Sequence, residues 1–376
     1  MRALILAAGL ATRLAPLSDT VPKAALPVLN RPLLHHVLDW LGRCGLREAA
    51  VNLHHLPEEV RRVARQYDRP GWTLRYSDER ARILLTAGAL APLRNYFEGK
   101  GTFVLVNGKI VTDLDLGPAL QFHRKNGCLA TLVTVPNTTG EPFSHVRSTP
   151  GGMFDGVMHW ADAVGQNLEP RVFTGIHLIE PEILRHVAPG VPSDTVRDLY
   201  PALRAQGIPV GVFCGDGLWM EFSTPERYLR NTIDLLRMVS GDGAHLDFPV
   251  AMGTGGRMPG SANGNWRWPQ GFCCAGREPG IGNIFLKRSV LGPGAELEEG
   301  AAVSESIFHG ENRVNRNAVV QNCILGRWVN VPPGKTWRNL MVTTGSGRGR
   351  EGLVKTPLRL DAPVPGLPEG AEREGR

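Results

Sequence analysis

Short apolar runs alternate with amphipathic segments over the first 235 residues of the chain. Residues 3–7 are an uninterrupted apolar run typical of a buried strand, and residues 32–41 place leucine and valine side chains on one face of a helix. The alternation continues with strands predicted at residues 49–53, 73–76, 102–106 and 129–135 and a helix at 58–66. This order predicts an α/β domain with a Rossmann-like, mostly parallel sheet flanked by helices. Ligands of such sheets bind beyond the carboxyl ends of the strands.

A different period appears after residue 280. Aliphatic residues recur there at a spacing of six: Leu291, Leu297 and Val303, then Val314 and Val320, then Leu325 and Val331. This period is typical of units with one short strand and one turn, each of which places an aliphatic side chain inward. It predicts a short left-handed parallel β-helix-like domain, and a set of irregular strands is the alternative.

Composition divides the chain into four parts. Residues 1–238 form the predicted α/β domain, and residues 239–280, rich in Gly, Pro, Ser and Trp, are predicted to be a linker or a packing segment. Residues 281–345 form the β-helix-like domain. Residues 346–376 are rich in Gly, Pro and charge and are predicted to be disordered.

The net charge narrows the possible partners. The chain carries a formal charge of +6, but its Lys and Arg residues are dispersed, which favours phosphorylated metabolites over nucleic acid. No stretch approaches the ~18 apolar residues that span a membrane. The six cysteines include no CxxC pair, which is typical of free thiols in a reducing compartment. We therefore expect a cytoplasmic protein that binds neither nucleic acid nor membranes.

The strongest chemical signal lies in residues 4–34, LILAAGLATRLAPLSDTVPKAALPVLNRPLL. A buried strand opens there into a turn of small residues, whose backbone N–H groups can approach phosphate oxygens closely. Arg13 offers a fork of donors to a triphosphate, and Lys23 offers a mobile point charge. Pro22 and Pro27 stiffen the segment that presents Lys23. The combination predicts a site for nucleotide phosphates.

This segment resembles the sugar-phosphate nucleotidyltransferases, also called nucleotide-sugar pyrophosphorylases, whose pattern is approximately LAAGxGTRLxPLTxxxPKxxLPV. Further matches are TAGAL at 86–90, VNG at 106–108, FTGIHLI at 173–179 and WMEFSTPERYL at 219–229. The resemblance covers residues 1–235 in order. The β-helix-like tail is similar to the second domain that many members carry.

The resemblance implies an exchange of a nucleoside triphosphate and a sugar 1-phosphate to a nucleotide sugar and pyrophosphate, with Mg²⁺ as cofactor. The sugar phosphate oxygen attacks the α-phosphorus in line, and the metal and cationic side chains stabilise the developing charge. Arg13 and Lys23 would be the catalytic cations. The implied nucleotide-binding residues are Ala8, Gly9, Leu10, Ala11 and Gly88, and the implied sugar-binding residues are Thr174 and Gly175. The β-helix-like domain implies homo- or hetero-oligomers.

Both metal-binding aspartates of the family are replaced. The family reads Asn-Gly-Asp where this chain has Lys109 in third place, and the second aspartate appears as Glu221. An ammonium group cannot ligate Mg²⁺, so we expect impaired turnover. Three arrangements are open: Lys109 pairs with Glu221 and takes the place of the metal cation, acts as a weak surrogate cation that preserves some activity, or turns to solvent and leaves the site empty.

Other positions also depart from the family pattern. Leu85 and Ser223 replace glycines, and Ala11 replaces a glycine of the turn, where a positive φ would strain alanine by roughly 1 kcal/mol. No counterpart of the family's Glu-Lys-Pro segment occurs between residues 140 and 171. Two functions therefore stay open. The chain is either an impaired enzyme of nucleotide-sugar biosynthesis or a silent homologue that binds a nucleotide sugar and regulates or scaffolds another protein.

Four further polar residues are weighed as site candidates. Asp113 and Asp115 are expected to cap a helix or face solvent rather than bind metal. His177 either faces the sugar pocket or is a packed histidine. His309 is the candidate for a third and weaker hypothesis, an acyltransferase role of the β-helix-like domain.

Overall fold

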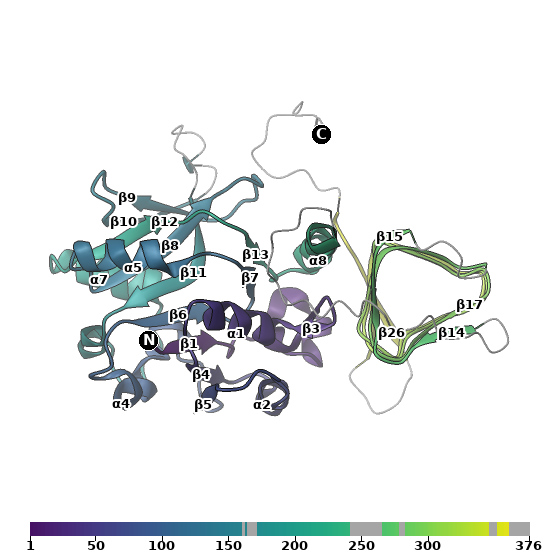
Figure 1. Ribbon diagram of the computed structural model, residues 1–376, viewed down its shortest axis with the longest axis horizontal. Coiled ribbons are helices and arrows are strands. Elements are labelled where there is room, and N and C mark those ends of the chain that lie inside the picture. Colours follow the sequence, from purple (N-terminus) through teal and green to yellow (C-terminus); the bar gives the residue numbers. More distant parts are fainter. Residues whose placement is uncertain (160–161, 164–170, 241–264, 278–282, 346–351, 361–376) are drawn as a thin grey trace.

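The computed structural model describes residues 1–159, 162–163, 171–240, 265–277, 283–345 and 352–360. In Figure 1 an α/β domain lies beside a triangular prism of strands, and helix α8 (Pro225–Ser240) lies between them. Within this described part of the chain, no helix is both long enough and apolar enough to cross a membrane.

The α/β domain is built on one nine-stranded sheet. Its central strands run parallel: β6 (Phe103–Asn107), β1 (Ala3–Leu6), β4 (Glu48–Leu53) and β5 (Thr73–Asp78). Strand β11 (Arg171–Ile179) pairs antiparallel with β6 and with β8 (Ala130–Pro136). The remaining strands are β12 (Val210–Cys214), β9 (His145–Ser148) and β10 (Phe154–Met158). The predicted Rossmann-like α/β fold is confirmed.

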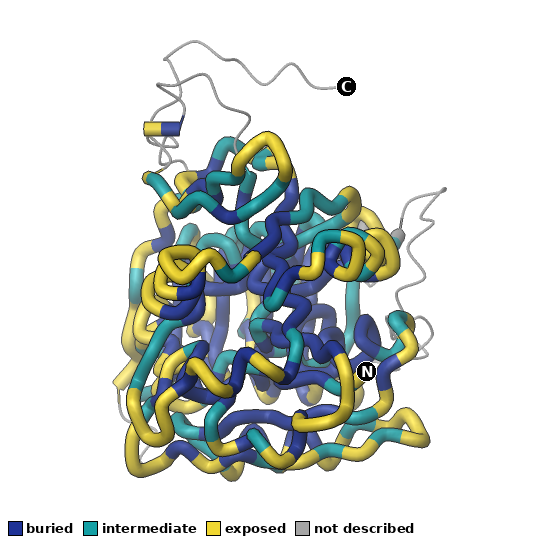
Figure 2. Tube along the Cα trace, turned by 90° about the vertical axis from the view of Figure 1, so that its left-hand side faces the viewer, coloured by how far each residue is buried: buried dark blue, intermediate teal, exposed yellow. Residues whose placement is uncertain are grey.

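The packing of strand β1 explains why its sequence is uninterruptedly apolar. Ala3 and Ile5 enter the core formed with α1 (Leu33–Arg43) and α2 (Pro57–Arg65), while Leu4 enters a second core on the other face. A parallel strand covered on both faces has no polar side. The other helices are α3 (Leu85–Gly88), α4 (Arg94–Phe97), α5 (Leu116–Lys125) and α7 (Tyr200–Ala205). Figure 2 shows buried segments inside and exposed loops at the periphery.

The prism is a parallel β-helix with three strands in each coil. Equivalent positions such as Ser289 and Ser306 are 17 residues apart and hydrogen-bonded. The first face stacks β16 (Phe285–Leu291), β18 (Ala302–Ser304), β21 (Val319–Gln321) and β24 (Thr336–Arg338). The second stacks β19 (Ile307–Phe308), β22 (Ile324–Leu325) and β25 (Leu340–Thr344), and the third β17 (Ala295–Glu298), β20 (Arg313–Val314) and β23 (Asn330–Val331). The predicted β-helix-like domain is confirmed, and the alternative of irregular strands is wrong.

The aliphatic side chains of the six-residue period lie inside the prism, where residues 17 apart form columns. Leu297, Val314 and Val331 are fully buried and occupy equivalent positions in successive coils. One turn position repeats as well, because Asn322 and Asn339 have φ values of 53° and 52°. Asparagine tolerates this left-handed conformation better than most residues, so the turns are locally encoded.

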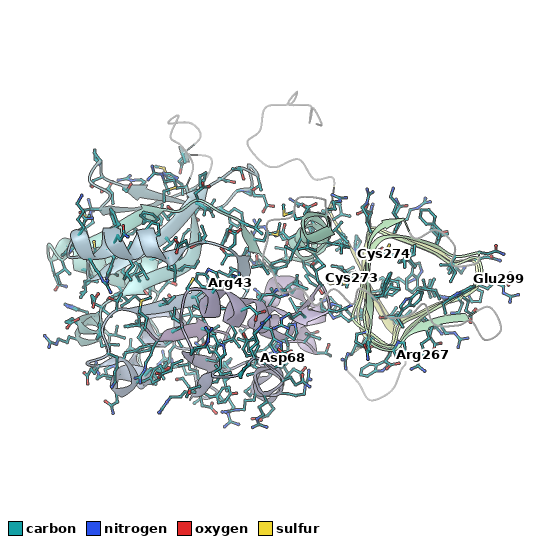
Figure 3. All side chains as sticks on the ribbon, viewed as in Figure 1. Arg43, Asp68, Arg267, Cys273, Cys274 and Glu299 are labelled. Atoms are coloured by element: carbon teal, nitrogen blue, oxygen red, sulfur yellow. The ribbon has the colours of Figure 1, made fainter. Side chains whose placement is uncertain are left out.

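One face of the prism packs against the α/β domain. Its outward column, formed by Val290, Ile307, Ile324 and Met341, is buried in one cluster with residues of α8. Figure 3 shows Cys273 and Cys274 of β15 (Phe272–Arg277) on this side of the prism. Neither cysteine forms a disulfide within the described residues.

A neutral hydrogen-bonded group crosses the same boundary. Tyr228 of α8 donates its hydroxyl hydrogen to the carbonyl oxygen of Pro27 at 2.6 Å, and its oxygen lies 2.9 Å from Nε2 of His309. Pro27 belongs to the hairpin of β2 (Pro27–Val28) and β3 (Arg31–Pro32). We call Pro27, Tyr228 and His309 the domain junction.

Two segments differ from their sequence-based expectations. Within residues 239–280, β14 (Asn265–Trp268) pairs with β17, and β15 pairs with β16, while residues 241–264 lie outside the described residues. The expectation of a disordered tail over 346–376 is wrong for β26 (Leu353–Pro357), which pairs antiparallel with β25. Strand β25 offers an edge of backbone donors and acceptors, and β26 satisfies it. Residues 361–376 lie outside the described residues.

Candidate functional site: a nucleotide cleft with a lysine at the metal position

A cleft of about 230 Å³ opens beyond the carboxyl ends of β1, β4 and β6. Its lining residues are Leu6, Ala7, Ala8, Gly9, Lys23, Ala24, Asn52, Glu79, Ile83, Leu85, Thr86, Asn107, Gly108 and Lys109. The lining includes two lysines, Lys23 and Lys109, and two large apolar side chains, Ile83 and Leu85. The cleft lies where the strand order predicted a ligand site.

The small-residue turn after β1 forms part of the cleft wall. The backbone N–H groups of Ala7 and Ala8 donate to Oδ1 of Asn52, at 2.6 and 3.1 Å. Ala11 has a φ of 54°, which confirms that alanine is held where glycine is favoured. Leu10 is 47% exposed, so its side chain is not part of the core.

Lys23 presents its ammonium group at the cleft from a short helical turn, Lys23–Ala25. Burial, the charge of Lys109 and the charge of Arg13 lower the pKa of Lys23 to about 8, although Glu221 acts in the opposite direction. Arg13 is exposed on the preceding turn. Lys23 therefore lies within electrostatic reach of both Lys109 and Arg13, and Arg13 is not among the residues that line the cleft.

Lys109 and Glu221 form an ion pair, as one of the sequence-based hypotheses expected. Strand β7 (Ile110–Thr112) pairs with β13 (Trp219–Glu221), and Nζ of Lys109 donates to Oε1 of Glu221 at 2.5 Å. Glu221 is 6% exposed. Burial alone would raise its pKa, but Lys109, the Ser223 hydroxyl and Arg227 outweigh burial and lower the pKa to about 2.

The ion pair continues into a longer series of alternating charges. Oε2 of Glu221 accepts from Ser223 at 2.5 Å and from Arg227 at 2.8 Å. Arg227 also donates to Glu141 at 2.5 Å, and Arg230 donates to the other Glu141 oxygen at 2.8 Å. We call Lys109, Glu221, Arg227, Glu141 and Arg230 the charge chain. Sequence reasoning identified its first two members only.

These residues do not fit a magnesium ion. Mg²⁺ prefers several oxygen ligands in near-octahedral geometry, whereas both Glu221 oxygens already accept hydrogen bonds from cationic side chains. Across the described ranges, no group of three His, Cys, Asp or Glu residues is arranged to hold a metal. Asp115 caps α5 by accepting from Gly117 N–H, and Asp113 accepts from Leu218 N–H. Asp115 therefore caps a helix as expected, whereas the exposed Asp113 also binds the backbone of Leu218, a contact that was not expected.

Apolar and acidic side chains also line the cleft. Leu85 has a φ of 63° and is 47% exposed, so the family's glycine position is left-handed here as well. Gly88 packs against the loop that contains Val191, because a Cβ there would lie 2.6 Å from the Val191 carbonyl oxygen. Asn52 and Glu79, which line the cleft, were missed in the sequence. The available signal was a polar residue inside a buried strand and a glutamate directly after β5.

The two predicted sugar-binding residues shape the backbone beside Asn107. The Thr174 hydroxyl donates to the Val133 carbonyl at 2.7 Å and is buried. Gly175 has a φ of 80°, and a Cβ there would lie 2.0 Å from Nδ2 of Asn107. Glycine is therefore required by this close approach.

The two histidine candidates are packed residues. His177 is buried and lies 2.6 Å from the Tyr200 hydroxyl, and burial lowers its pKa to about 3. His309 is buried at the domain junction. Neither histidine is among the residues that line the cleft.

Comparison with known proteins identifies the class. Residues 2–234 match the family described as Nucleotidyl transferase, and residues 280–337 match the one described as GlmU-like, C-terminal hexapeptide. The first match spans more than half of the chain, so this chain belongs to the nucleotidyl transferase family. Its relatives are sugar-phosphate nucleotidyltransferases.

Individual relatives support this membership over most of the chain. It is similar to the UTP--glucose-1-phosphate uridylyltransferase of Synechocystis sp., with 28% identity over 87% of this chain and 88% of that protein. It is also similar to the Probable mannose-1-phosphate guanylyltransferase 3 of Oryza sativa subsp. japonica, with 26% identity over 88% and 92%. The structure of HddC from Yersinia pseudotuberculosis has the same fold, with a TM-score of 0.52, 16% identity and coverage of 62% of this chain and 99% of that one.

Proposed function

We propose that the cleft binds a nucleoside triphosphate or a nucleotide sugar, and that the chain exchanges a triphosphate and a sugar 1-phosphate only slowly. In that reaction the sugar phosphate oxygen bonds to the α-phosphorus, the bond to the bridging oxygen breaks, and pyrophosphate leaves. Family membership supports the reaction class. The 2.5 Å contact between Lys109 and Glu221 is the observation that supports slow turnover.

Charge balance supports binding of phosphates without a metal. Two aspartates and one divalent cation sum to zero charge, and so do one lysine and one glutamate. Lys23 then adds positive charge in the cleft, and the exposed Arg13 adds charge near Lys23, as a polyphosphate requires. A divalent ion contributes several kcal/mol of transition-state stabilisation through directed bonds to phosphate oxygens. A single ammonium group that is already bonded to Glu221 supplies less, which predicts binding with little turnover.

A second candidate function follows from the same contact. Because both oxygens of Glu221 are engaged, the chain is also suited to be a silent homologue that binds a nucleotide sugar and regulates or scaffolds another protein. The relatives are named as uridylyl- and guanylyltransferases, so family membership leaves the base open. Assembly through the β-helix belongs to this proposal as well, since a scaffold needs a second surface.

Pyrophosphate release tests slow turnover. Purified full-length protein with Mg²⁺, a panel of nucleoside triphosphates and a panel of sugar 1-phosphates should release pyrophosphate far more slowly than the order of 10 per second that is ordinary for enzymes. Release at that ordinary rate would show that Lys109 does not impair the site.

Substitution of Lys109 tests the cause. Lys109→Asp restores a carboxylate and should increase both Mg²⁺ affinity, measured by calorimetry, and pyrophosphate release. Lys109→Met removes the charge without adding an oxygen ligand, so it should increase neither and should weaken nucleotide binding. Equal Mg²⁺ affinity in the wild type and Lys109→Asp would contradict the assignment of position 109.

A further inference from the structure

A second cavity, of about 520 Å³, lies at the other end of the strands from the nucleotide cleft. Arg47 directly precedes β4 and Trp72 directly precedes β5, so this cavity lies at the amino ends of these two strands. The cleft lies at their carboxyl ends, six residues or roughly 20 Å away. We call the second cavity the arginine cavity. Its lining residues are Asp39, Gly42, Arg43, Arg47, Tyr67, Arg69, Pro70 and Trp72, none of which lines the cleft.

The lining of the arginine cavity carries more positive than negative charge. Three arginines and one aspartate contribute to it, which leaves a surplus of two positive charges. Asp39 is buried and accepts from the Tyr67 hydroxyl at 2.8 Å and from Nε of Arg69 at 3.0 Å. Its other oxygen lies 3.0 Å from Nη2 of Arg31, which also pairs with Asp68 at 3.7 Å. These carboxylates are therefore engaged already, and they do not neutralise the surplus.

Two of the arginines are held in place and keep unused donors. Nη1 of Arg47 donates to the carbonyl oxygens of Gly42 at 2.6 Å and Leu46 at 2.8 Å, and its guanidinium carbon lies 6.0 Å from the centre of the Trp72 ring. Arg69 is fixed through Nε. Within the described part of the chain, Nε and Nη2 of Arg47 and both Nη groups of Arg69 have no hydrogen-bond partner. Donors that are positioned before a ligand arrives lose less entropy on binding.

Aromatic side chains form another wall of the arginine cavity. The rings of Tyr67 and Trp72 meet edge to face, with their centres 6.0 Å apart, and Pro70 lines the cavity with them. Such rings offer a large apolar contact area to the organic part of a ligand. The cavity therefore combines cationic donors with an apolar wall.

We propose that the arginine cavity binds a small phosphate monoester, with Arg47 and Arg69 donating to its phosphate oxygens. Its organic group contacts Tyr67 and Trp72. A phosphate monoester carries a charge of about −1.5 to −2 at neutral pH, which balances the surplus of the lining. The planar guanidinium group matches two phosphate oxygens at once. This ligand lies too far from the cleft to take part in the exchange reaction, so the inference does not depend on the proposed function.

The indole N–H resonances of the full-length protein labelled with ¹⁵N test this inference. The variant Trp72→Phe assigns the Trp72 signal, which reports on the arginine cavity. Titration with phenyl phosphate at constant ionic strength should shift this signal saturably. Inorganic phosphate should bind severalfold more weakly, because it lacks a ring to contact the aromatic wall. Equal affinity for the two probes would overturn the assignment of an ester, and no shift with either probe would overturn the site.

A double variant tests the role of the arginines. Arg47→Gln combined with Arg69→Gln should weaken phenyl phosphate binding, measured at the Trp72 signal, about tenfold. The matched control combines Arg316→Gln with Arg338→Gln, which removes two positive charges from exposed positions of the prism and should leave the affinity unchanged. Equal weakening in both double variants would mean that only net charge matters and would overturn the site. Circular dichroism checks that the variants are folded.

The variant Lys23→Gln separates the arginine cavity from the cleft. It removes an ammonium group that lines the cleft, so it should weaken any binding of phosphate there. The response of the Trp72 signal to phenyl phosphate should stay as in the wild type. Loss of this response would mean that Trp72 reports binding in the cleft, and it would overturn the second site while leaving the proposed function intact.

Discussion

Two adjacent residues of α8 form hydrogen bonds with different groups of residues. Arg227 belongs to the charge chain and bonds to Glu221 and Glu141, whereas Tyr228 belongs to the domain junction and bonds to Pro27. Both groups contain buried side chains and both use side-chain hydrogen bonds. The charge chain consists of ionised partners, and the domain junction consists of neutral ones.

The difference separates two tasks. The charge chain fixes Glu221 and Lys109 at the cleft, and its energy depends on the ionisation of every member. The domain junction anchors the segment that follows Lys23, since Pro27 lies on the hairpin that leaves the cleft. Arg227 of α8 therefore supports the charged groups at the cleft, while Tyr228 of the same helix holds the segment that follows Lys23.

Removal of Arg227 should have the largest effect on stability. In Arg227→Met, a carboxylate oxygen of Glu221 and one of Glu141 both lose a partner, and breaking a buried ion pair from one side costs about 3 kcal/mol or more. The measurement is the urea midpoint. Arg230→Met is the matched control, because this side chain is 40% exposed and its pair should contribute about 1 kcal/mol at most. Equal losses in the two variants would mean that the charge chain is not a buried network.

Tyr228→Phe should have an intermediate effect. It leaves the Pro27 carbonyl and His309 Nε2 without their shared partner while keeping the ring in place, at a cost of roughly 2 kcal/mol. The same denaturation experiment measures it. Tyr76→Phe changes a half-buried ring on β5 and should cost less. A loss no larger than in this control would show that the junction hydrogen bonds do not stabilise the contact.

The smallest predicted effect concerns the pH dependence of stability, which should differ between the domain junction and the charge chain. Burial, with a contribution from Arg327, lowers the pKa of His309 to about 3, whereas an unfolded histidine titrates near its ordinary value. The unfolded state therefore binds the proton first, and the stability due to neutral His309 is present above pH ~6.5 and is lost as the pH falls toward 3. The pKa of Glu221 lies at about 2, so its contribution is lost only as the pH falls from ~4.5 toward 2.

Between pH 7 and 5 the junction should respond and the charge chain should not, while other buried histidines such as His177 add their own contribution. His309→Gln should therefore reduce the fall in unfolding free energy over this range by up to about 1.4 kcal/mol per pH unit. His186→Gln, a change at an exposed histidine, is the control. Identical pH profiles for the wild type and His309→Gln would show that the junction does not contribute to the acid response.

The fold was predictable because its patterns are local. A buried run such as residues 3–7 and a six-residue period such as Leu291 to Leu297 each report their own strand or coil. The strand β26 was missed because its strand conformation depends on pairing with β25, and its own sequence contains Pro357 and follows a glycine-rich stretch. Edge pairing depends on a partner that the segment itself does not encode.

The site residues were predictable only where they align with a sequence motif of the family. Lys109 and Glu221 were recognised since the family pattern aligns them, and β7 and β13 bring them together. Glu141 and Arg227 are 86 residues apart in the sequence, and no local pattern predicts their contact. Glu79 was missed for a related reason, because a glutamate after a strand is ordinary in sequence and becomes distinctive only when burial surrounds it.

The repeat of 17 residues in the β-helix also constrains how its length can change over time. Duplication of one whole repeat would add a layer about 4.8 Å thick and extend every interior stack by one member, with no existing contact altered. Insertion of a single residue would instead turn the downstream aliphatic side chains out of the interior. The prism can therefore gain or lose complete layers, but the 17-residue register of the remaining repeats must be kept.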